Sequence, residues 1–80
     1  MSNTPHQLAD EFPSDAERIQ ALKASDAHFA KLVDEYHSVN DAIHRAETHV
    51  EPVTPEHETE LRKTRMAVKD EIATMLRAAA

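Results

Sequence analysis

The stretch Glu51-Pro52-Val53-Thr54-Pro55 decides the fold, because it separates two long parts of the chain that contain no proline. Thr54 is suited to cap a helix, and Pro55 is suited to its first position. Only about four residues join the two parts, so helices on either side must lie antiparallel as neighbours. The sequence therefore predicts an all-α fold, an antiparallel two-helix hairpin with its turn at residues 51–54.

The first long part begins with its own helix-start signal. Ser14-Asp15-Ala16-Glu17 has the pattern of a capping box, in which Ser14 caps and Glu17 reaches back. We expect one helix over residues 14–50 and a second over residues 55–78. An N-terminal extension, residues 1–13, holds a short helix that ends at Phe12-Pro13, so the hairpin unit spans residues 14–80.

Apolar side chains recur every seven residues along both predicted helices, which is typical of helices packed in a coiled coil. Folding the chain at the turn pairs positions whose numbers sum to about 105, which places Ile43 near Leu61 and Tyr36 near Val68. The same register places Asp41 near Arg62 and Arg65. The predicted core consists of Phe29, Leu32, Tyr36, Ile43, Leu61, Val68, Ile72 and Met75. Asn40 also falls in the stripe, either buried, where it would fix the register, or at the edge of the seam, which we favour.

The first predicted helix extends about ten residues beyond the second, so Ile19 and Leu22 have no expected partner on the second helix. Leu8 and Phe12 of the N-terminal extension could fold back over them, or a second subunit could cover them. A chain this short buries a thin core, which favours self-association. We therefore treat Ile19, Leu22, Leu8 and Phe12 as a candidate interaction surface.

The composition limits the classes of function. The 80 residues contain 9 Lys and Arg against 15 Asp and Glu, and a net charge of −6 disfavours general binding to nucleic acid. The absence of cysteine excludes disulfides and thiolate zinc sites. The first ten residues do not resemble a signal peptide, and no apolar stretch approaches the length of a membrane span. We expect a cytoplasmic protein.

No constellation in the sequence predicts catalysis. Without glycine there is no phosphate-binding loop, and a hairpin offers no cleft for a small-molecule substrate, so we expect no enzyme and no cofactor. His37, Asp41 and His44 share a helix face and suggest a metal or pH-responsive site, but a solvated polar face is favoured, so we assign no metal. The basic residues of Arg62–Lys69 suggest a nucleic-acid-associated regulator, against which we favour salt bridges within the hairpin.

Two blocks of sequence carry a resemblance to a known family. The first comprises Ala27-His28-Phe29-Ala30-Lys31-Leu32, Asp34-Glu35-Tyr36-His37 and Ile43-His44-Arg45; the second comprises Leu61-Arg62-Lys63, Arg65, Val68-Lys69-Asp70-Glu71-Ile72 and Met75-Leu76. In this order, with a proline-containing turn between them, they resemble the YdcH family of small bacterial proteins. The resemblance implies a helical hairpin or coiled coil of unknown function, and it supplies no catalytic or ligand residues.

The leading functional hypothesis is a protein-interaction module that acts through helix–helix contacts. Its partner is expected to be a second copy of the chain or another helical protein, because a short apolar stripe without a covering helix is suited to both. The nucleic-acid regulator and the histidine-based sensor stay as the alternatives.

Overall fold

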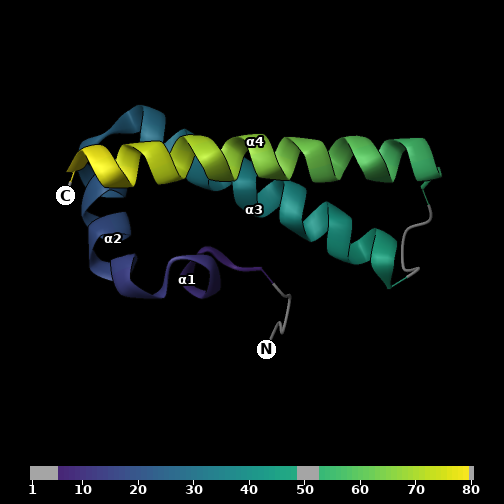
Figure 1. Ribbon diagram of the computed structural model, residues 1–80, viewed down its shortest axis with the longest axis horizontal. Coiled ribbons are helices and arrows are strands. Elements are labelled where there is room, and N and C mark those ends of the chain that lie inside the picture. Colours follow the sequence, from purple (N-terminus) through teal and green to yellow (C-terminus); the bar gives the residue numbers. More distant parts are fainter. Residues whose placement is uncertain (1–5, 49–52, 80) are drawn as a thin grey trace.

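The computed structural model describes residues 6–48 and 53–79, in which all regular structure is helical (Figure 1). The elements are α1 (Leu8–Glu11), a turn of 3-10 helix η1 (Pro13–Asp15), α2 (Ala16–Ser25), α3 (Ala27–Glu47) and α4 (Pro55–Ala79). The two long helices, α3 and α4, run antiparallel and pack against each other (Figure 1). The all-α fold class and the hairpin are therefore confirmed.

Helix α4 begins at the signal that the sequence offers. The hydroxyl of Thr54 accepts a hydrogen bond from the backbone N–H of His57 at 3.1 Å, and Pro55 occupies the first helical position. Glu56 and Glu58 lie in the first turn, where carboxylates suit the helix dipole. The helix ends at Ala79, one residue beyond the predicted end. The predicted turn lies mostly outside the described residues.

The helix predicted over residues 14–50 is not continuous, and this part of the prediction is wrong. The chain breaks at Asp26, whose backbone is extended with φ −132° and ψ 108°. The Asp26 carboxylate accepts hydrogen bonds from the N–H groups of His28 at 3.0 Å and Phe29 at 3.1 Å, so Asp26 caps α3. The start of α2 also differs from the prediction, because a turn of 3-10 helix, η1, stands there in place of the Ser14 capping box. The N-cap residue of α2 is Asp15, and its side chain makes no capping hydrogen bond.

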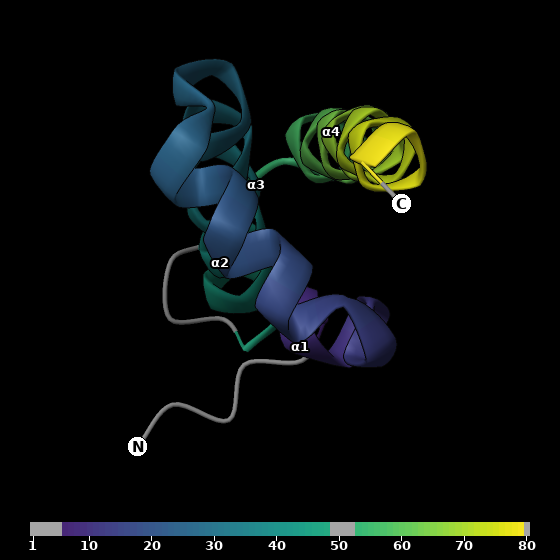
Figure 2. The same cartoon turned by 90° about the vertical axis from the view of Figure 1, so that its left-hand side faces the viewer.

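The break allows α2 to turn and bring α1 back along the hairpin. Seen along the molecule, α4, the pair α2 and α3, and α1 occupy the three corners of a triangle (Figure 2). The buried cluster at its centre combines residues of the hairpin with Leu8 and Ile19. Of the predicted core, Phe29, Leu32, Tyr36, Ile43, Val68 and Ile72 are buried, whereas Leu61 and Met75 are only partly buried.

The expected overhang is covered by the chain itself. Leu8 and Ile19 are 4% and 5% exposed, and Phe12 and Leu22 are partly buried against the same cluster. Ile19 thus has apolar partners within the chain, which is the first of the two alternatives that the sequence left open, in which the N-terminal extension folds back. The reason is the bend at Asp26, since a straight helix would have carried Ile19 beyond the end of α4.

Candidate interaction site

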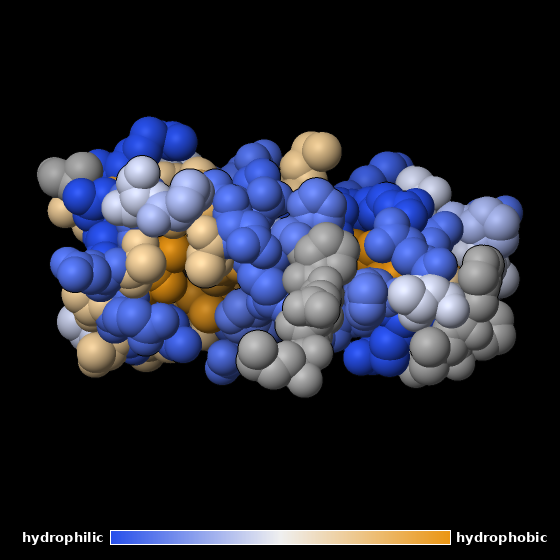
Figure 3. Space-filling view, turned by 90° about the horizontal axis from the view of Figure 1, so that it is seen from below, coloured by the Kyte–Doolittle hydropathy of each residue, from blue (hydrophilic) through white to orange (hydrophobic). Residues whose placement is uncertain are grey.

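An apolar hollow lies where α1 and α2 pack on α3. It has a volume of about 190 Å³ and is lined mainly by Leu8, Ala9, Ala16, Ile19 and Val33. The polar residues that complete its lining are Gln7, Gln20, Lys23 and His37. Figure 3, which views the side of α1, shows hydrophobic surface reaching the outside at the end of the molecule where α2 lies, surrounded by hydrophilic residues. An apolar floor with polar groups around it is the usual chemistry of a binding hollow.

Polar contacts hold α1 on the hairpin, and we call His6, Glu11, Tyr36 and Lys69 the N-terminal clasp. The hydroxyl of the buried Tyr36 donates to the backbone carbonyl of His6 at 2.6 Å. Lys69 Nζ of α4 lies 3.0 Å from Glu11 Oε1, and His6 Nδ1 lies 3.4 Å from the same oxygen. His6 has a φ of 63°, which is uncommon for a residue other than glycine.

The clasp shifts the protonation equilibria of two of its members. The hydrogen bond from Lys69 is the main reason that the pKa of Glu11 is lowered, and the positive charge of Lys69 adds to it. Burial raises the pKa of the Tyr36 hydroxyl, and the nearby charge of Glu11 raises it further. At neutral pH Glu11 is therefore ionised, which favours the clasped state, and Tyr36 is protonated and can donate its hydrogen bond.

A buried amide lies in the seam between α3 and α4. Asn40 is only 1% exposed, and its Oδ1 accepts a hydrogen bond from Arg65 Nη1 at 2.9 Å. The expectation that Asn40 sits at the edge of the seam is therefore wrong. The two numbers, 40 and 65, sum to 105, which agrees with the predicted register. The register expectation did not foresee this pair, because it assigned Arg65 to Asp41.

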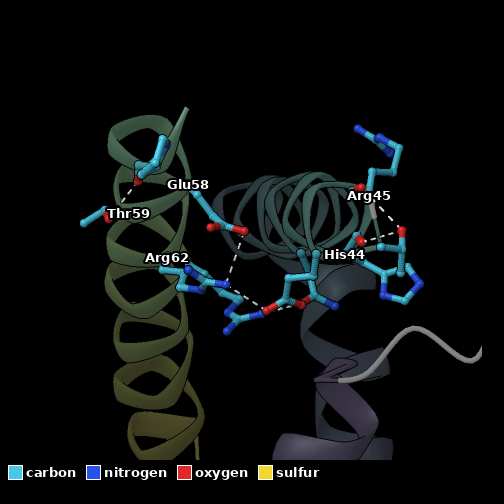
Figure 4. A network of polar contacts seen from close by, with 10 residues as sticks. His44, Arg45, Glu58, Thr59 and Arg62 are labelled. Atoms are coloured by element: carbon cyan, nitrogen blue, oxygen red, sulfur yellow. Dashed lines mark hydrogen bonds and ion pairs between the residues drawn. The ribbon is translucent and has the colours of Figure 1, made fainter. Parts of the chain in front are cut away.

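At the turn end of the hairpin, Arg62 links the two helices. Its Nη2 lies 2.9 Å from Glu47 of α3 and 3.4 Å from Glu58 of α4 (Figure 4). The hydrogen bond from Arg62 is the main reason that the pKa of Glu47 is lowered. Glu47 therefore takes the place of Asp41, the partner that the folding register predicted for Arg62.

The last turn of α3 is closed by a side chain beyond the helix. The hydroxyl of Thr48 donates to the carbonyls of His44 at 2.9 Å and Arg45 at 3.3 Å (Figure 4). The His44 carbonyl also accepts the backbone N–H of Thr48, so the hydroxyl adds a second hydrogen bond to it and reaches the Arg45 carbonyl near the helix end. On α4 the Thr59 hydroxyl donates in the same way to the Pro55 carbonyl at 3.0 Å.

The basic face of α4 is neutralised within the chain. Besides Arg62 and Arg65, Lys63 lies 3.9 Å from Glu60 and Lys69 is bound to Glu11. Each of these four cations thus has an acidic or amide partner, which favours the salt-bridge interpretation over nucleic-acid binding.

The histidines do not gather into a metal site in residues 6–48 and 53–79. No three His, Asp or Glu side chains in these ranges lie close enough together to hold a metal ion, and His37, Asp41 and His44 are no exception. His28 instead approaches Glu71, with Nε2 3.1 Å from Oε2. The helices of the described ranges also lack an apolar segment long enough to cross a membrane.

Comparison with known families gives a match that covers the hairpin. Residues 29–76, more than half of the chain, match the family model described as DUF465, a protein of unknown function. The chain belongs to the DUF465 family. YdcH-like proteins belong to DUF465 as well, so the resemblance found in the sequence is confirmed. No curated protein and no solved structure matches the chain.

The DUF465 match separates the hairpin from the N-terminal segment that precedes it. It covers α3 from Phe29 and α4 as far as Leu76, which is the hairpin alone. Helices α1 and α2, which close one side of that hairpin, lie outside the matched residues. In this DUF465 chain the hollow is therefore formed jointly by the family unit and by the segment that precedes it.

Proposed function

We propose that this protein is an interaction module that binds a partner helix on the side of the DUF465 hairpin to which α1 and α2 are docked. The observation that carries the proposal is the hollow, in which Val33 of the hairpin meets Leu8 and Ile19 of the preceding segment. That side of the hairpin already receives one helical segment, so its shape and chemistry suit helices. We assign no catalytic step to it.

The hollow suits the apolar face of an amphipathic helix. Its floor is made of aliphatic side chains, and Gln20 and Lys23 on α2 can bond the polar flank of the partner. Ala9 and Ala16 are exposed and small, so the backbone of a partner can come close at these two positions.

The test uses the full chain with one added side chain at the hollow. Ala16→Arg places a long charged group in the hollow without removing any buried atom. We expect it to reduce at least tenfold the amount of the partner that the tagged protein captures from its native cell extract, since each 1.4 kcal/mol of lost binding energy is about a factor of ten.

The matched control is Ala21→Arg. Ala21 is exposed on the same helix, α2, and does not line the hollow. A partner that is lost with Ala16→Arg and kept with Ala21→Arg supports the proposal. If both variants capture the same proteins in the same amounts as the parent, the hollow is not the binding site.

A further inference from the structure

The outer face of α4 carries a second periodic stripe, which points away from the core. Its members are exposed and follow each other at three, four or seven residues: Glu56, Thr59, Lys63, Met66, Asp70 and Arg77. The buried residues of the same helix, Val68, Ile72 and Leu76, lie on the opposite side. Figure 2 places α4 at an outer corner of the molecule, and the hollow described above lies elsewhere.

The middle of this outer stripe is apolar. Met66 is 65% exposed, the largest exposed fraction among the big hydrophobic side chains of the described residues. Ala67 lies beside it, and the two line a shallow depression of about 390 Å³ together with Thr59, Arg62, Lys63 and Asp70. An interface usually has apolar groups in its middle and charged groups toward its edges, and this stripe has the same arrangement.

The charges of the stripe are complementary to those of a second copy. When two α4 helices lie antiparallel about a two-fold axis next to Met66, positions whose numbers sum to 133 face each other. Lys63 then meets Asp70 of the other copy, since 63 and 70 sum to 133. Glu56 meets Arg77, since 56 and 77 also sum to 133. Each pairing occurs twice, because a two-fold interface repeats every contact.

The same stripe disfavours the parallel arrangement. In a parallel pair each residue faces its own copy, so Lys63 meets Lys63 and Asp70 meets Asp70, and like charges repel. The outer pairing spans α4 from Glu56 to Arg77, a length of about 32 Å at 1.5 Å per residue. We propose that this outer face is the contact through which two copies of the chain form an antiparallel dimer, back to back through α4.

The proposal is tested by reversing one charge at a time. In Lys63→Asp, positions 63 and 70 of each copy both carry aspartate. In Asp70→Lys, the same two positions both carry lysine. Sedimentation equilibrium on each variant alone should show the dimer dissociation constant rising about tenfold or more relative to the parent, because two attractive pairs become repulsive. Both positions are exposed, so the fold should be unaffected.

The decisive measurement is the mixture of the two variants. In a mixed dimer each aspartate of one copy faces a lysine of the other, so association should return to about the parental value. Added salt should weaken the parental dimer, since exposed charges are screened within about 8 Å at physiological ionic strength. A parent that stays monomeric at millimolar concentration overturns the proposal. A dimer that neither variant weakens overturns it as well, and so does a mixture of the two variants that fails to restore association. Capture of a partner at the hollow is independent of all these results.

Discussion

At the scale of single residues, the pair Asn40 and Arg65 sets the alignment of the hairpin. A buried amide that loses its partner costs about 1–3 kcal/mol, so sliding α4 along α3 by one turn is opposed by this hydrogen bond as well as by lost packing. Arg65 occupies a position where the apolar series of α4 is interrupted. Its guanidinium explains the interruption, because it satisfies a polar group inside the seam.

Ile43 offers the clearest test of packing. It is completely buried, and Ile43→Ala should lower the free energy of unfolding by about 2–5 kcal/mol because it leaves a cavity. Urea unfolding followed by circular dichroism measures this change. Lys31→Ala, at an exposed position of the same helix, should change stability by less than about 0.5 kcal/mol. Equal midpoints for both variants would mean that Ile43 is not buried as described.

At the scale of elements, the bend between α2 and α3 depends on one carboxylate. Asp26 accepts two backbone hydrogen bonds, and its extended backbone lets α2 leave the axis of α3. A continuous helix would bond the same backbone groups internally, but it would also take Ile19 out of the core. The bend is therefore a balance between local helix formation and burial of the preceding segment.

Asp26→Ala tests that balance. Removal of the cap should destabilise the protein by about 0.5–2 kcal/mol, measured by thermal unfolding, whereas Asp26→Ser should retain most of the stability because serine also caps. An alanine variant that is more helical and at least as stable as the parent would show that α2 and α3 can merge without penalty. In that case the cap does not maintain the bend.

At the scale of the whole molecule, the clasp ties the preceding segment to the DUF465 hairpin. Glu11 faces both Lys69 and His6, and Tyr36 beneath it holds the His6 carbonyl. The contacts of Lys69 with Glu11 and of Tyr36 with His6 join residues 58 and 30 positions apart in the sequence, so these two form only when the N-terminal segment is docked. The state of the clasp therefore reports on whether the N-terminal segment covers the hairpin.

The clasp should make stability depend on pH. The pKa of Glu11 is lowered in the folded protein, so the ionised Glu11 stabilises the folded state at pH values above the ordinary pKa of 4.5. This stabilisation is lost as the pH falls through the lowered pKa. Lys69→Gln removes the main cause of the shift. The difference in melting temperature between parent and variant should be largest at about pH 7 and should shrink toward about pH 2.

Comparison with the variant is needed because the pair Glu47 and Arg62 titrates in the same direction. That pair is present in both proteins, so its effect cancels in the difference between them. A difference in melting temperature that stays constant across the pH range would contradict the assigned role of Glu11.

The sequence by itself determined that the fold is all-α, where α4 begins, and that two long helices pair as a hairpin. The start of α4 at Thr54 and Pro55 depends on hydrogen bonds between near neighbours, and the seven-residue apolar repeat predicts that two helices pack together. Both features follow from local chemistry, so they can be seen without coordinates. The family resemblance was visible for the same reason, since it rests on those two helices.

Only the tertiary structure decided the roles of two polar residues in the apolar repeat of the first long part of the chain. Asp26 and Asn40 occupy similar places in the apolar repeat, yet one ends a helix and the other is buried in the seam. Asp26 bends the chain because the bend buries Leu8 and Ile19, and Asn40 is buried because Arg65 of α4 reaches it. In both cases the deciding free energy comes from residues distant in sequence, and a periodic pattern contains no information about those contacts.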